Sequence, residues 1–137
     1  MSFELAPRDT LRLQGVHPDL IRVVRGAALH YPKTGRFIVV EGLRTLEKQR
    51  EYFQAGKSRT MKSRHLTGHA VDLAPYVDTD GDGDLELSWQ RDHFFPIVDA
   101  MRASAAAAGV LITWGGDWTS FQDCPHWEIQ PEKYPWP

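Results

Sequence analysis

The sequence has 137 residues, of which 42% are hydrophobic and 25% are charged, and its formal net charge at pH 7 is −2. These values are typical of a globular protein, so we expect a single domain, residues 1–137, with a core large enough to fold without disulfides. A slightly acidic chain with scattered basic residues lacks the basic face of nucleic-acid-binding proteins, which excludes nucleic acid as an expected partner.

The hydrophobic pattern predicts alternating helices and strands. Helices are indicated by apolar residues three or four positions apart, and strands by short apolar runs between turn residues. In chain order, we expect a helix at 18–31, a strand at 37–40, a helix at 46–55, a strand at 69–73, a helix at 94–108, and strands at 111–114 and 126–129. The segments expected outside these elements are a polar lead-in at 1–17, a loop at 57–67 and a proline-rich surface tail at 131–137. This order predicts an α+β fold with helices packed on one face of a small, mainly antiparallel sheet.

Two short motifs carry the clearest chemical signal: SRHLTGHAVD, and DCPHWE far downstream. In these motifs, His65, Asp72 and His126 offer two imidazole nitrogens and one carboxylate oxygen. Catalytic zinc sites use three such ligands and leave a fourth position to water. Asp72 also lies in a predicted strand among apolar residues, where a buried carboxylate needs a partner. Asp123, three residues before His126, is placed where a general base is needed.

The two motifs, S-x-H-x-x-G-x-A-x-D followed by acid-x-x-H, resemble those of the LAS-type zinc peptidases. This family includes D-Ala-D-Ala carboxypeptidases, D-Ala-D-Ala dipeptidases and phage L-alanyl-D-glutamate endopeptidases. The resemblance covers roughly residues 19–130, including an EGLRT segment similar to the family's arginine motif and a WGGDW segment similar to the phage endolysin branch. It implies a Hedgehog/DD-peptidase-like fold and one Zn²⁺ per chain. Asp rather than Glu at position 123 points to the phage endopeptidases.

The resemblance implies a zinc metallopeptidase that hydrolyses the peptide stem of bacterial peptidoglycan at the L-Ala–D-Glu bond, as a phage or prophage endolysin. The alternatives are a D-Ala-D-Ala carboxypeptidase or dipeptidase, and a non-catalytic wall-binding module. The N-terminus lacks the basic and apolar regions of a signal peptide, and no apolar run is long enough for membrane insertion. We therefore expect a monomer made in the host bacterial cytoplasm that reaches peptidoglycan through a separate membrane pore.

Further residues are candidates for contact with substrate or ligands. Arg44 directly follows a predicted buried strand, and its guanidinium is expected to stabilise an oxyanion or hold a substrate carboxylate. Glu128 shares a strand face with His126 and is expected to support that ligand, with a role as the base left open. Candidate substrate contacts are Ser63, Trp114 and Asp117, with Trp118 also considered for the cleft wall. Core packing is an equal interpretation for the tryptophans.

Three other features allow two interpretations. His69 lies four residues after His65, but it faces the other side of the predicted strand, so we expect it to stay off the metal. The acidic segment 78–86 resembles the start of an EF-hand, but Trp89 occupies the position of the bidentate glutamate, so an acidic turn is favoured over a calcium site. The basic residues of 57–64 are either a solvated loop face or an attraction for an anionic wall polymer. Cys124, the only cysteine, excludes an intramolecular disulfide.

Overall fold

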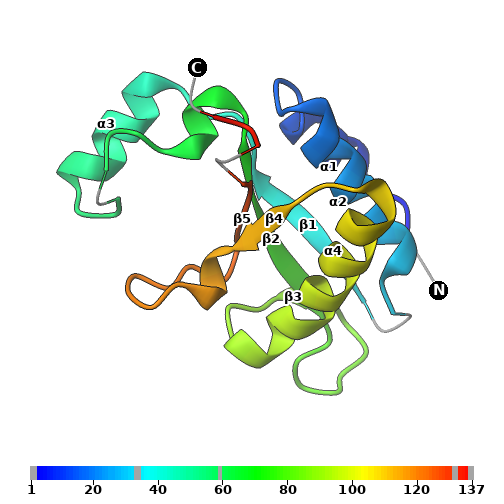
Figure 1. The fold of residues 1–137 in the computed structure, drawn as a ribbon. Coiled ribbons are helices and arrows are strands. Elements are labelled where there is room, and N and C mark those ends of the chain that lie inside the picture. The colour runs from blue at the N-terminus through cyan, green and yellow to red at the C-terminus, as the bar shows by residue number, and fades with distance from the viewer. Residues whose placement is uncertain (1–2, 33–34, 59, 131–132, 136–137) are drawn as a thin grey trace.

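The computed structural model describes residues 3–32, 35–58, 60–130 and 133–135, and within them an antiparallel sheet forms the centre of the molecule (Figure 1). Its strands are β1 (Arg36–Glu41), β2 (Ala70–Val77), β3 (Glu86–Leu87), β4 (Ile112–Trp114) and β5 (His126–Ile129). The strand order is β1-β2-β5-β4, and β3 pairs with the C-terminal end of β2. All of these pairs are antiparallel. The α+β fold expected from the sequence is confirmed.

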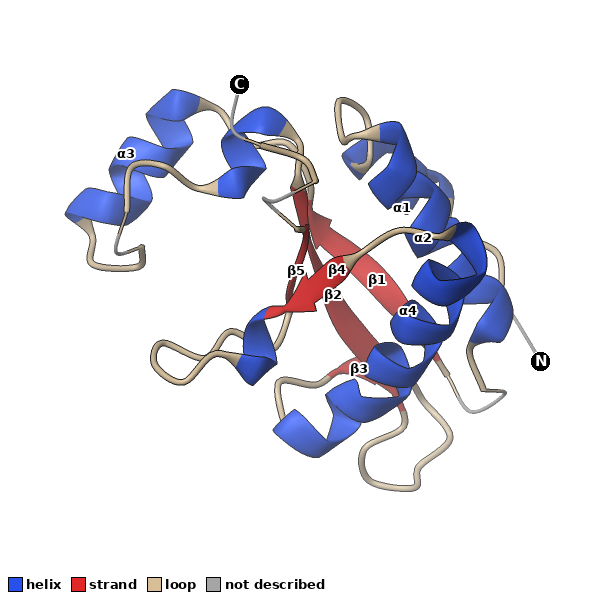
Figure 2. Ribbon diagram, viewed as in Figure 1, coloured by secondary structure: helices blue, strands red, loops and turns tan. Residues whose placement is uncertain are grey.

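Helices cover one face of this sheet (Figure 2). The α-helices are α1 (Pro7–Arg12), α2 (Pro18–His30), α3 (Leu46–Gln54) and α4 (Phe95–Ala108), and the short 3-10 helices are η1 (Arg64–Thr67), η2 (Arg91–Phe94) and η3 (Gly115–Asp117). The first, second and fourth α-helices lie together on the core side, whereas α3 stands apart from them (Figure 1). Across the described residues, no helix is both long and apolar enough to cross a membrane.

The two long helices form where the apolar pattern predicts them. Pro18 begins α2, and the Nδ1 atom of His17 accepts a hydrogen bond from the Asp19 amide at 3.0 Å. Gly109 ends α4 with φ = 70°, a conformation that glycine adopts without steric cost. The Ser104 hydroxyl of α4 donates to the Val23 carbonyl of α2 at 2.7 Å, so the helices cross closely.

The sheet separates the hydrophobic core from a polar face. Successive side chains of a strand point to opposite faces. In β5, Trp127 and Ile129 are buried in the core, which leaves His126 and Glu128 on the other face. In β2, Val71 and Leu73 belong to the core, so Asp72 projects from the opposite side. The same alternation that builds the core therefore collects the polar side chains.

Several element boundaries differ from the expected ones. The lead-in contains α1, a helix without an apolar stripe whose only buried residue is Asp9. The second strand continues to Val77 instead of ending at residue 73, and β3 begins at Glu86, the last residue of the expected acidic turn. The expected loop at 57–67 contains η1. In the tail, Tyr134 donates a hydrogen bond to Asp19 at 2.6 Å, and positions 131–132 and 136–137 lie outside the described residues.

Candidate metal centre and active site

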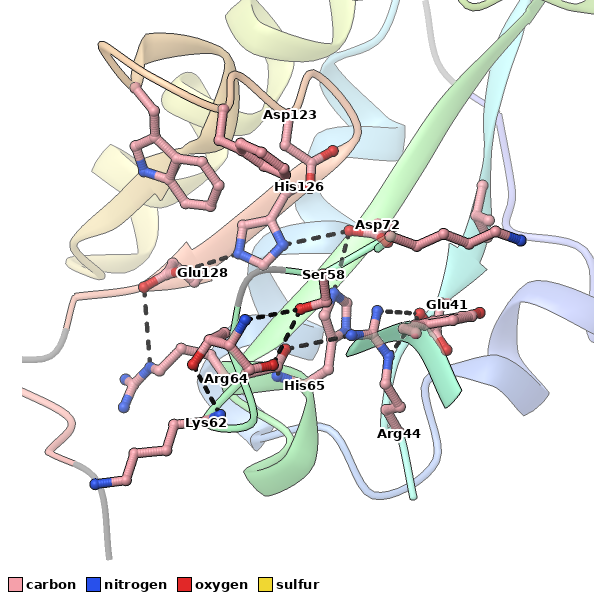
Figure 3. A pocket seen from close by; sticks show the side chains of 17 residues that line it. Glu41, Arg44, Ser58, Lys62, Arg64, His65, Asp72, Asp123, His126 and Glu128 are labelled. Atoms are coloured by element: carbon pink, nitrogen blue, oxygen red, sulfur yellow. Dashed lines mark hydrogen bonds and ion pairs between the residues drawn. The ribbon is translucent and has the colours of Figure 1, made fainter. Parts of the chain in front are cut away.

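Three side chains from separate parts of the chain meet on the polar face of the sheet (Figure 3). His65 comes from η1, Asp72 from β2 and His126 from β5, and one possible ligand atom of each lies within 4.8 Å of the others. The Oδ1 atom of Asp72 lies 3.2 Å from His65 Nε2 and 3.4 Å from His126 Nδ1. Asp72 and His126 are opposite each other in the β2–β5 pairing. Sheet pairing thus explains how two motifs remote in sequence converge.

The outer nitrogen of each imidazole has its own hydrogen-bond partner. His65 Nδ1 donates to the Gly42 carbonyl at 2.8 Å. His126 Nε2 donates to Glu128 Oε1 at 2.7 Å. A neutral imidazole that donates through its outer nitrogen presents the lone pair of the inner nitrogen, which is the arrangement typical of metal-ligating histidines. Glu128 therefore makes the hydrogen bond that a residue supporting His126 needs, and its role stays a prediction.

The centre is largely shielded from solvent, with side-chain exposures of 2% for His65, 8% for His126 and 18% for Asp72. Burial opposes ionisation of Asp72, but hydrogen bonds with His126 and His65 outweigh it and hold the pKa of Asp72 well below its usual range. Burial likewise disfavours the imidazolium, yet Asp72 and Glu128 raise the pKa of His126 to about 9. An ionised carboxylate faced by two oriented imidazoles fits a divalent cation such as Zn²⁺.

Asp123 lies beside these ligands on the segment between η3 and β5. Its amide donates to the Gly115 carbonyl at 3.0 Å, and its own carbonyl accepts from the His126 amide at 3.1 Å. A Cβ atom at Gly115 would clash with the Asp123 carbonyl and lie 3.0 Å from His126 Cβ, so only glycine allows this close approach. Burial, and then the negative charge of Asp72, raise the pKa of the half-buried Asp123 carboxyl. A raised pKa makes the carboxylate a better proton acceptor.

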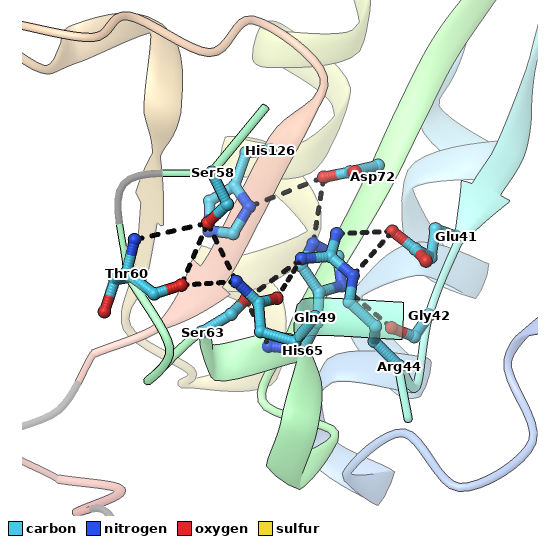
Figure 4. A network of polar contacts seen from close by, with 10 residues as sticks. All are labelled: Glu41, Gly42, Arg44, Gln49, Ser58, Thr60, Ser63, His65, Asp72 and His126. Carbon is cyan, nitrogen blue, oxygen red and sulfur yellow. Dashed lines mark hydrogen bonds and ion pairs between the residues drawn. The ribbon is translucent and has the colours of Figure 1, made fainter. Parts of the chain in front are cut away.

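Arg44 is held rigidly at the edge of the same site (Figure 4). Its amide donates to the His65 carbonyl at 2.9 Å, and its side chain is only 9% exposed. The guanidinium forms an ion pair with Glu41, donates to Gln49 Oε1 at 2.6 Å and lies 3.4 Å from Ser63 Oγ. Ser63 in turn caps η1 by accepting from the His65 amide at 3.2 Å. Arg44 and the ligand His65 are therefore coupled through both backbone and side chain.

A cavity of about 570 Å³ opens over these residues, a size suited to a small ligand or peptide segment. The residues discussed so far that line it are Glu41, Arg44, Ser63, His65, Asp72, Asp123, His126 and Glu128. One wall is built by Tyr52 and the segment after α3, and the other includes Trp118 and Phe121. The Trp118 ring lies 5.0 Å from that of His126, so this tryptophan packs directly beside a candidate ligand.

Two expected substrate contacts lie elsewhere. Trp114 is 4% exposed, stacks on Trp127 at 6.0 Å and donates through its indole nitrogen to the Cys124 carbonyl at 2.7 Å. Asp117 is exposed and pairs with Arg102 at 2.8 Å. Neither lines the cavity, because β4 directs Trp114 into the core and η3 directs Asp117 to the surface. Trp118 lines the cavity in their place, and contact of Trp114 and Asp117 with substrate stays a prediction that their position does not favour.

The basic segment before His65 is divided between structural and cavity-lining roles. Arg64 donates to the carbonyls of Ile129 and Tyr134 at 3.1 and 2.6 Å, so it anchors the chain rather than a solvated face. Lys57 and Lys62 line the cavity, and no ion pair involves either of them among the described residues. Position 59, also in this segment, lies outside the described residues.

His69 and the acidic segment lie apart from this centre. His69 Nδ1 shares a hydrogen bond with the Thr67 hydroxyl, and its ring lies 5.6 Å from that of His17. A second group of carboxylates lies within 4.8 Å of one another and consists of Asp78, Asp80, Asp82 and Glu86. The Asp78 carboxylate already accepts the amides of Gly81 and Gly83, at 2.8 and 2.9 Å. This arrangement agrees with an acidic turn, and calcium binding remains only a hypothesis.

Comparisons with known proteins agree with the geometry of the site. The family model described as phage L-alanyl-D-glutamate peptidase matches residues 1–134. The L-alanyl-D-glutamate peptidase of Escherichia phage T5 is 31% identical in an alignment of 138 positions, gaps included. The alignment covers 98% of this chain and 94% of that protein. The peptidase of the same name from Listeria phage A118 is 31% identical over 97 residues, covering 71% of this chain and 31% of the longer phage protein.

A solved structure extends this similarity to three dimensions. The crystal structure of the L-Ala D-Glu endopeptidase ChiX from Serratia marcescens superposes with a TM-score of 0.86 and 38% sequence identity. The match covers 98% of this chain and 96% of the Serratia chain, so it includes all elements of the candidate site. With a family model that spans nearly the whole sequence, the conclusion is that this chain belongs to the phage L-alanyl-D-glutamate peptidase family.

Proposed function

We propose that this protein is a zinc-dependent endopeptidase that cuts the L-Ala–D-Glu bond in the peptide stem of bacterial peptidoglycan, as a phage or prophage endolysin. The observation that carries this proposal is the convergence of His65, Asp72 and His126 beside Asp123 at a peptide-sized cavity. Family membership supports the same substrate class. The names of the relatives indicate which bond is cut, and the two imidazoles and one carboxylate of the site support zinc as the metal.

The ligands would be His65 Nε2, Asp72 Oδ1 and His126 Nδ1, the atoms that face one another in the site. Bound there, Zn²⁺ supplies Lewis acidity, which polarises the peptide carbonyl and makes the attacking water more acidic. Gly42 and Glu128 hold the two imidazoles in orientation through their outer nitrogens. The donor atoms are thus oriented before the metal binds.

Asp123 acts as the general base and then as the general acid. Its carboxylate takes a proton from the attacking water as the new C–O bond forms at the peptide carbonyl carbon. It then returns that proton to the amide nitrogen of D-Glu, so that the C–N bond breaks and a neutral amine leaves. The raised pKa of Asp123 suits the first step, since a less basic carboxylate would accept the proton less readily.

Arg44 stabilises the negative charge that develops on the carbonyl oxygen during attack. Glu41 and Gln49 hold the guanidinium against the cavity, so little reorientation is needed when the charge appears. A planar, fixed guanidinium suits this task better than a flexible ammonium group.

Lys57 and Lys62 are suited to attract the anionic peptide stem to the cavity, since a stem that contains D-Glu carries carboxylate charge. The substrate is therefore proposed to enter with its acidic side chains toward the segment that follows α3. For the protein to meet the wall from the cytoplasm, a separate membrane pore must release it.

Digestion of purified peptidoglycan, followed by mass spectrometry of the soluble products, tests the proposed bond. We expect new N-terminal D-Glu together with new C-terminal L-Ala. Neither should form when the protein has first been treated with a metal chelator. Release of D-Ala would establish D-Ala-D-Ala carboxypeptidase or dipeptidase activity instead. Sedimentation with peptidoglycan without any new termini would indicate a wall-binding module.

A further inference from the structure

Helix α3 is attached to the protein through a polar residue rather than through the core. The only buried residue of this helix is Gln49, whose exposure is 0%, whereas Leu46 and Phe53 are 54% and 45% exposed. The helix also stands apart from the three helices that cover the core (Figure 1). Burying an amide is costly unless its polar atoms are bonded, so the contacts of Gln49 must account for its position.

Both ends of the Gln49 amide are engaged (Figure 4). The Oε1 atom accepts a hydrogen bond from the Arg44 guanidinium at 2.6 Å. The Nε2 atom donates to Ser58 Oγ at 2.8 Å and to the Thr60 carbonyl at 2.5 Å. The acceptor end therefore holds the candidate oxyanion-stabilising residue, and the donor end holds the segment that forms one wall of the cavity.

This arrangement joins two parts of the active site, which also meet at the 3.4 Å contact between the Arg44 guanidinium and Ser63 Oγ. Arg44 is fixed from one side by Glu41, and Gln49 supplies its neutral partner on the other side. The wall carries Ser58, Thr60 and the cationic residue Lys62. Both parts share a single rigid amide, so movement of the wall would displace the guanidinium.

We propose that Gln49 is a positioning residue of the peptidase reaction, which keeps Arg44 and the cavity wall at Ser58 and Thr60 in one geometry. The inference rests on the proposed function, because it assigns Gln49 a role in the turnover of the peptide stem. Loss of the acceptor end should lower kcat through Arg44, and loss of the donor end should raise KM through the wall.

Two variants separate these effects. Gln49→Met keeps the length of the side chain and removes both ends, and we expect kcat/KM to fall ~10–100-fold, since small displacements of catalytic groups have effects of this size. Gln49→Glu keeps an acceptor for Arg44 and replaces the donor by an oxygen that faces the Thr60 carbonyl. We expect it to keep most of kcat and to raise KM. Arg50→Gln, an exposed change on the same helix, is the matched control and should behave as wild type.

A double-mutant cycle asks whether Gln49 acts through Arg44. If it does, Gln49→Met should lower kcat in the wild-type background and have little further effect on kcat in an Arg44→Ala background. Equal losses of kcat in both backgrounds would overturn the proposal, as would wild-type kcat and KM in both Gln49 variants. Zinc content and far-ultraviolet circular dichroism of each variant should match wild type. If Gln49→Met differs from wild type in zinc content or circular dichroism, Gln49→Glu is the variant that tests the proposal. A wild-type KM for Gln49→Glu then overturns it.

A measurement without substrate separates this proposal from the proposed function. Hydrogen exchange of residues 57–63, followed by mass spectrometry, should be faster in Gln49→Met than in wild type or Arg50→Gln. Unchanged exchange would overturn the proposed coupling even if the enzyme is an active peptidase. If exchange is faster in Gln49→Met but the wild-type protein cuts no peptidoglycan, the proposed function is wrong and the structural coupling stands.

Discussion

His65 and His126 each use one ring nitrogen outside the candidate metal position, so Gly42 and Glu128 set their orientation. The inner nitrogens then have a single common neighbour, the Asp72 carboxylate. Such a set is costly to bury without a cation. Neutral imidazoles that donate through their outer nitrogens turn lone pairs, not protons, toward the Asp72 carboxylate. At the scale of residues, the geometry therefore yields sharp predictions about metal binding.

Removal of a ligand should remove the metal. We expect purified wild-type protein to hold one zinc ion per chain and Asp72→Ala or His126→Ala to hold almost none, since two ligands rarely retain zinc through purification. His69→Ala is the matched control and should keep its zinc, because the His69 ring contacts His17 and Thr67 instead. Elemental analysis decides; full zinc in both ligand variants would reject the ligand set.

Asp123 and Glu128 should have separable effects. Asp123→Ala is expected to keep its zinc and its fold and to lose ~10²–10⁴-fold in kcat, the usual contribution of a general acid–base group. Glu128→Ala should instead weaken zinc binding ~10–100-fold and recover activity in excess zinc, since it orients His126. Kinetics with and without added zinc distinguish the two. An active Asp123→Ala beside a Glu128→Ala that excess zinc cannot rescue would identify Glu128 as the base.

Zinc affinity should depend on pH through His126. Zinc binds the neutral imidazole, and the raised pKa of His126, about 9, means that zinc must displace a proton at lower pH. Each unit of pH lowered below about 9 should therefore weaken the apparent affinity ~tenfold for the one proton released. Competition with a chelator of known affinity measures this slope. Glu128→Gln removes one of the two carboxylates that raise the pKa of His126. The zinc affinity of this variant should therefore begin to fall only at a lower pH than that of wild type. Identical pH profiles would show that Glu128 does not raise the pKa of His126.

At the scale of elements, α1 and α3 share an unusual mode of attachment. Each is a short helix whose only buried residue is polar, Asp9 in α1 and Gln49 in α3. Asp9 accepts hydrogen bonds from the amides of Val39 and Ala6, at 2.9 and 3.2 Å, and lies 3.6 Å from Arg36. These helices are therefore positioned by specific hydrogen bonds, which makes their attachment sensitive to single substitutions.

Asp9→Ala should be strongly destabilising. It leaves the buried Val39 amide without its acceptor and Arg36 without its ion pair, so we expect the free energy of unfolding to fall by ~3 kcal/mol. Asp9→Asn should cost less, because one oxygen remains to accept a hydrogen bond. Asp99→Ala replaces an exposed acid on α4 and should stay within ~0.5 kcal/mol of wild type. Urea unfolding followed by circular dichroism compares the three; equal stability of Asp9→Ala and Asp99→Ala would show that α1 is not anchored this way.

At the scale of the whole molecule, the two faces of the sheet have different roles: one packs the hydrophobic core and the other carries the candidate site. The hydrophobic core lies between the sheet and the helices α2 and α4, and the candidate metal centre lies on the opposite face. The candidate ligands are carried by two paired strands and one short helix that the core already supports. The fold should therefore not depend on the metal in the way that a small zinc-stabilised domain does.

Removal of zinc should abolish activity without unfolding the protein. After chelation, we expect a native-like far-ultraviolet spectrum, a lower Tm and no release of muropeptides. The stabilisation lost is the binding free energy at the ambient zinc concentration, ~4 kcal/mol when zinc is present at a thousand times its Kd. Added zinc should restore Tm and activity together. A chelated protein that loses its secondary structure at room temperature would show that the metal holds the fold.

The sequence by itself determined which residues are candidates for the chemistry of this protein. Metal ligation restricts residue type and spacing so strongly that two motifs predicted His65, Asp72 and His126 as ligands, with Asp123 beside them, and the structure brings the three predicted ligands together. Strand alternation also predicted that Asp72 lies on the face opposite Val71 and Leu73, as the structure shows. Helix α4 and its end at Gly109 followed from local pattern, because an apolar stripe and a left-handed glycine are properties of one segment.

Only the tertiary structure decided which segments meet. The pairing of β2 with β5 brings Asp72 opposite His126, and no local pattern reports the register of strands so distant in sequence. It also directs Trp114 into the core and leaves Trp118 at the cavity, although both occur in one motif. Helix α1 and the burial of Gln49 escaped prediction for a related reason. Their buried residues are polar, and a polar side chain shows that it is buried only when its distant partners are in place.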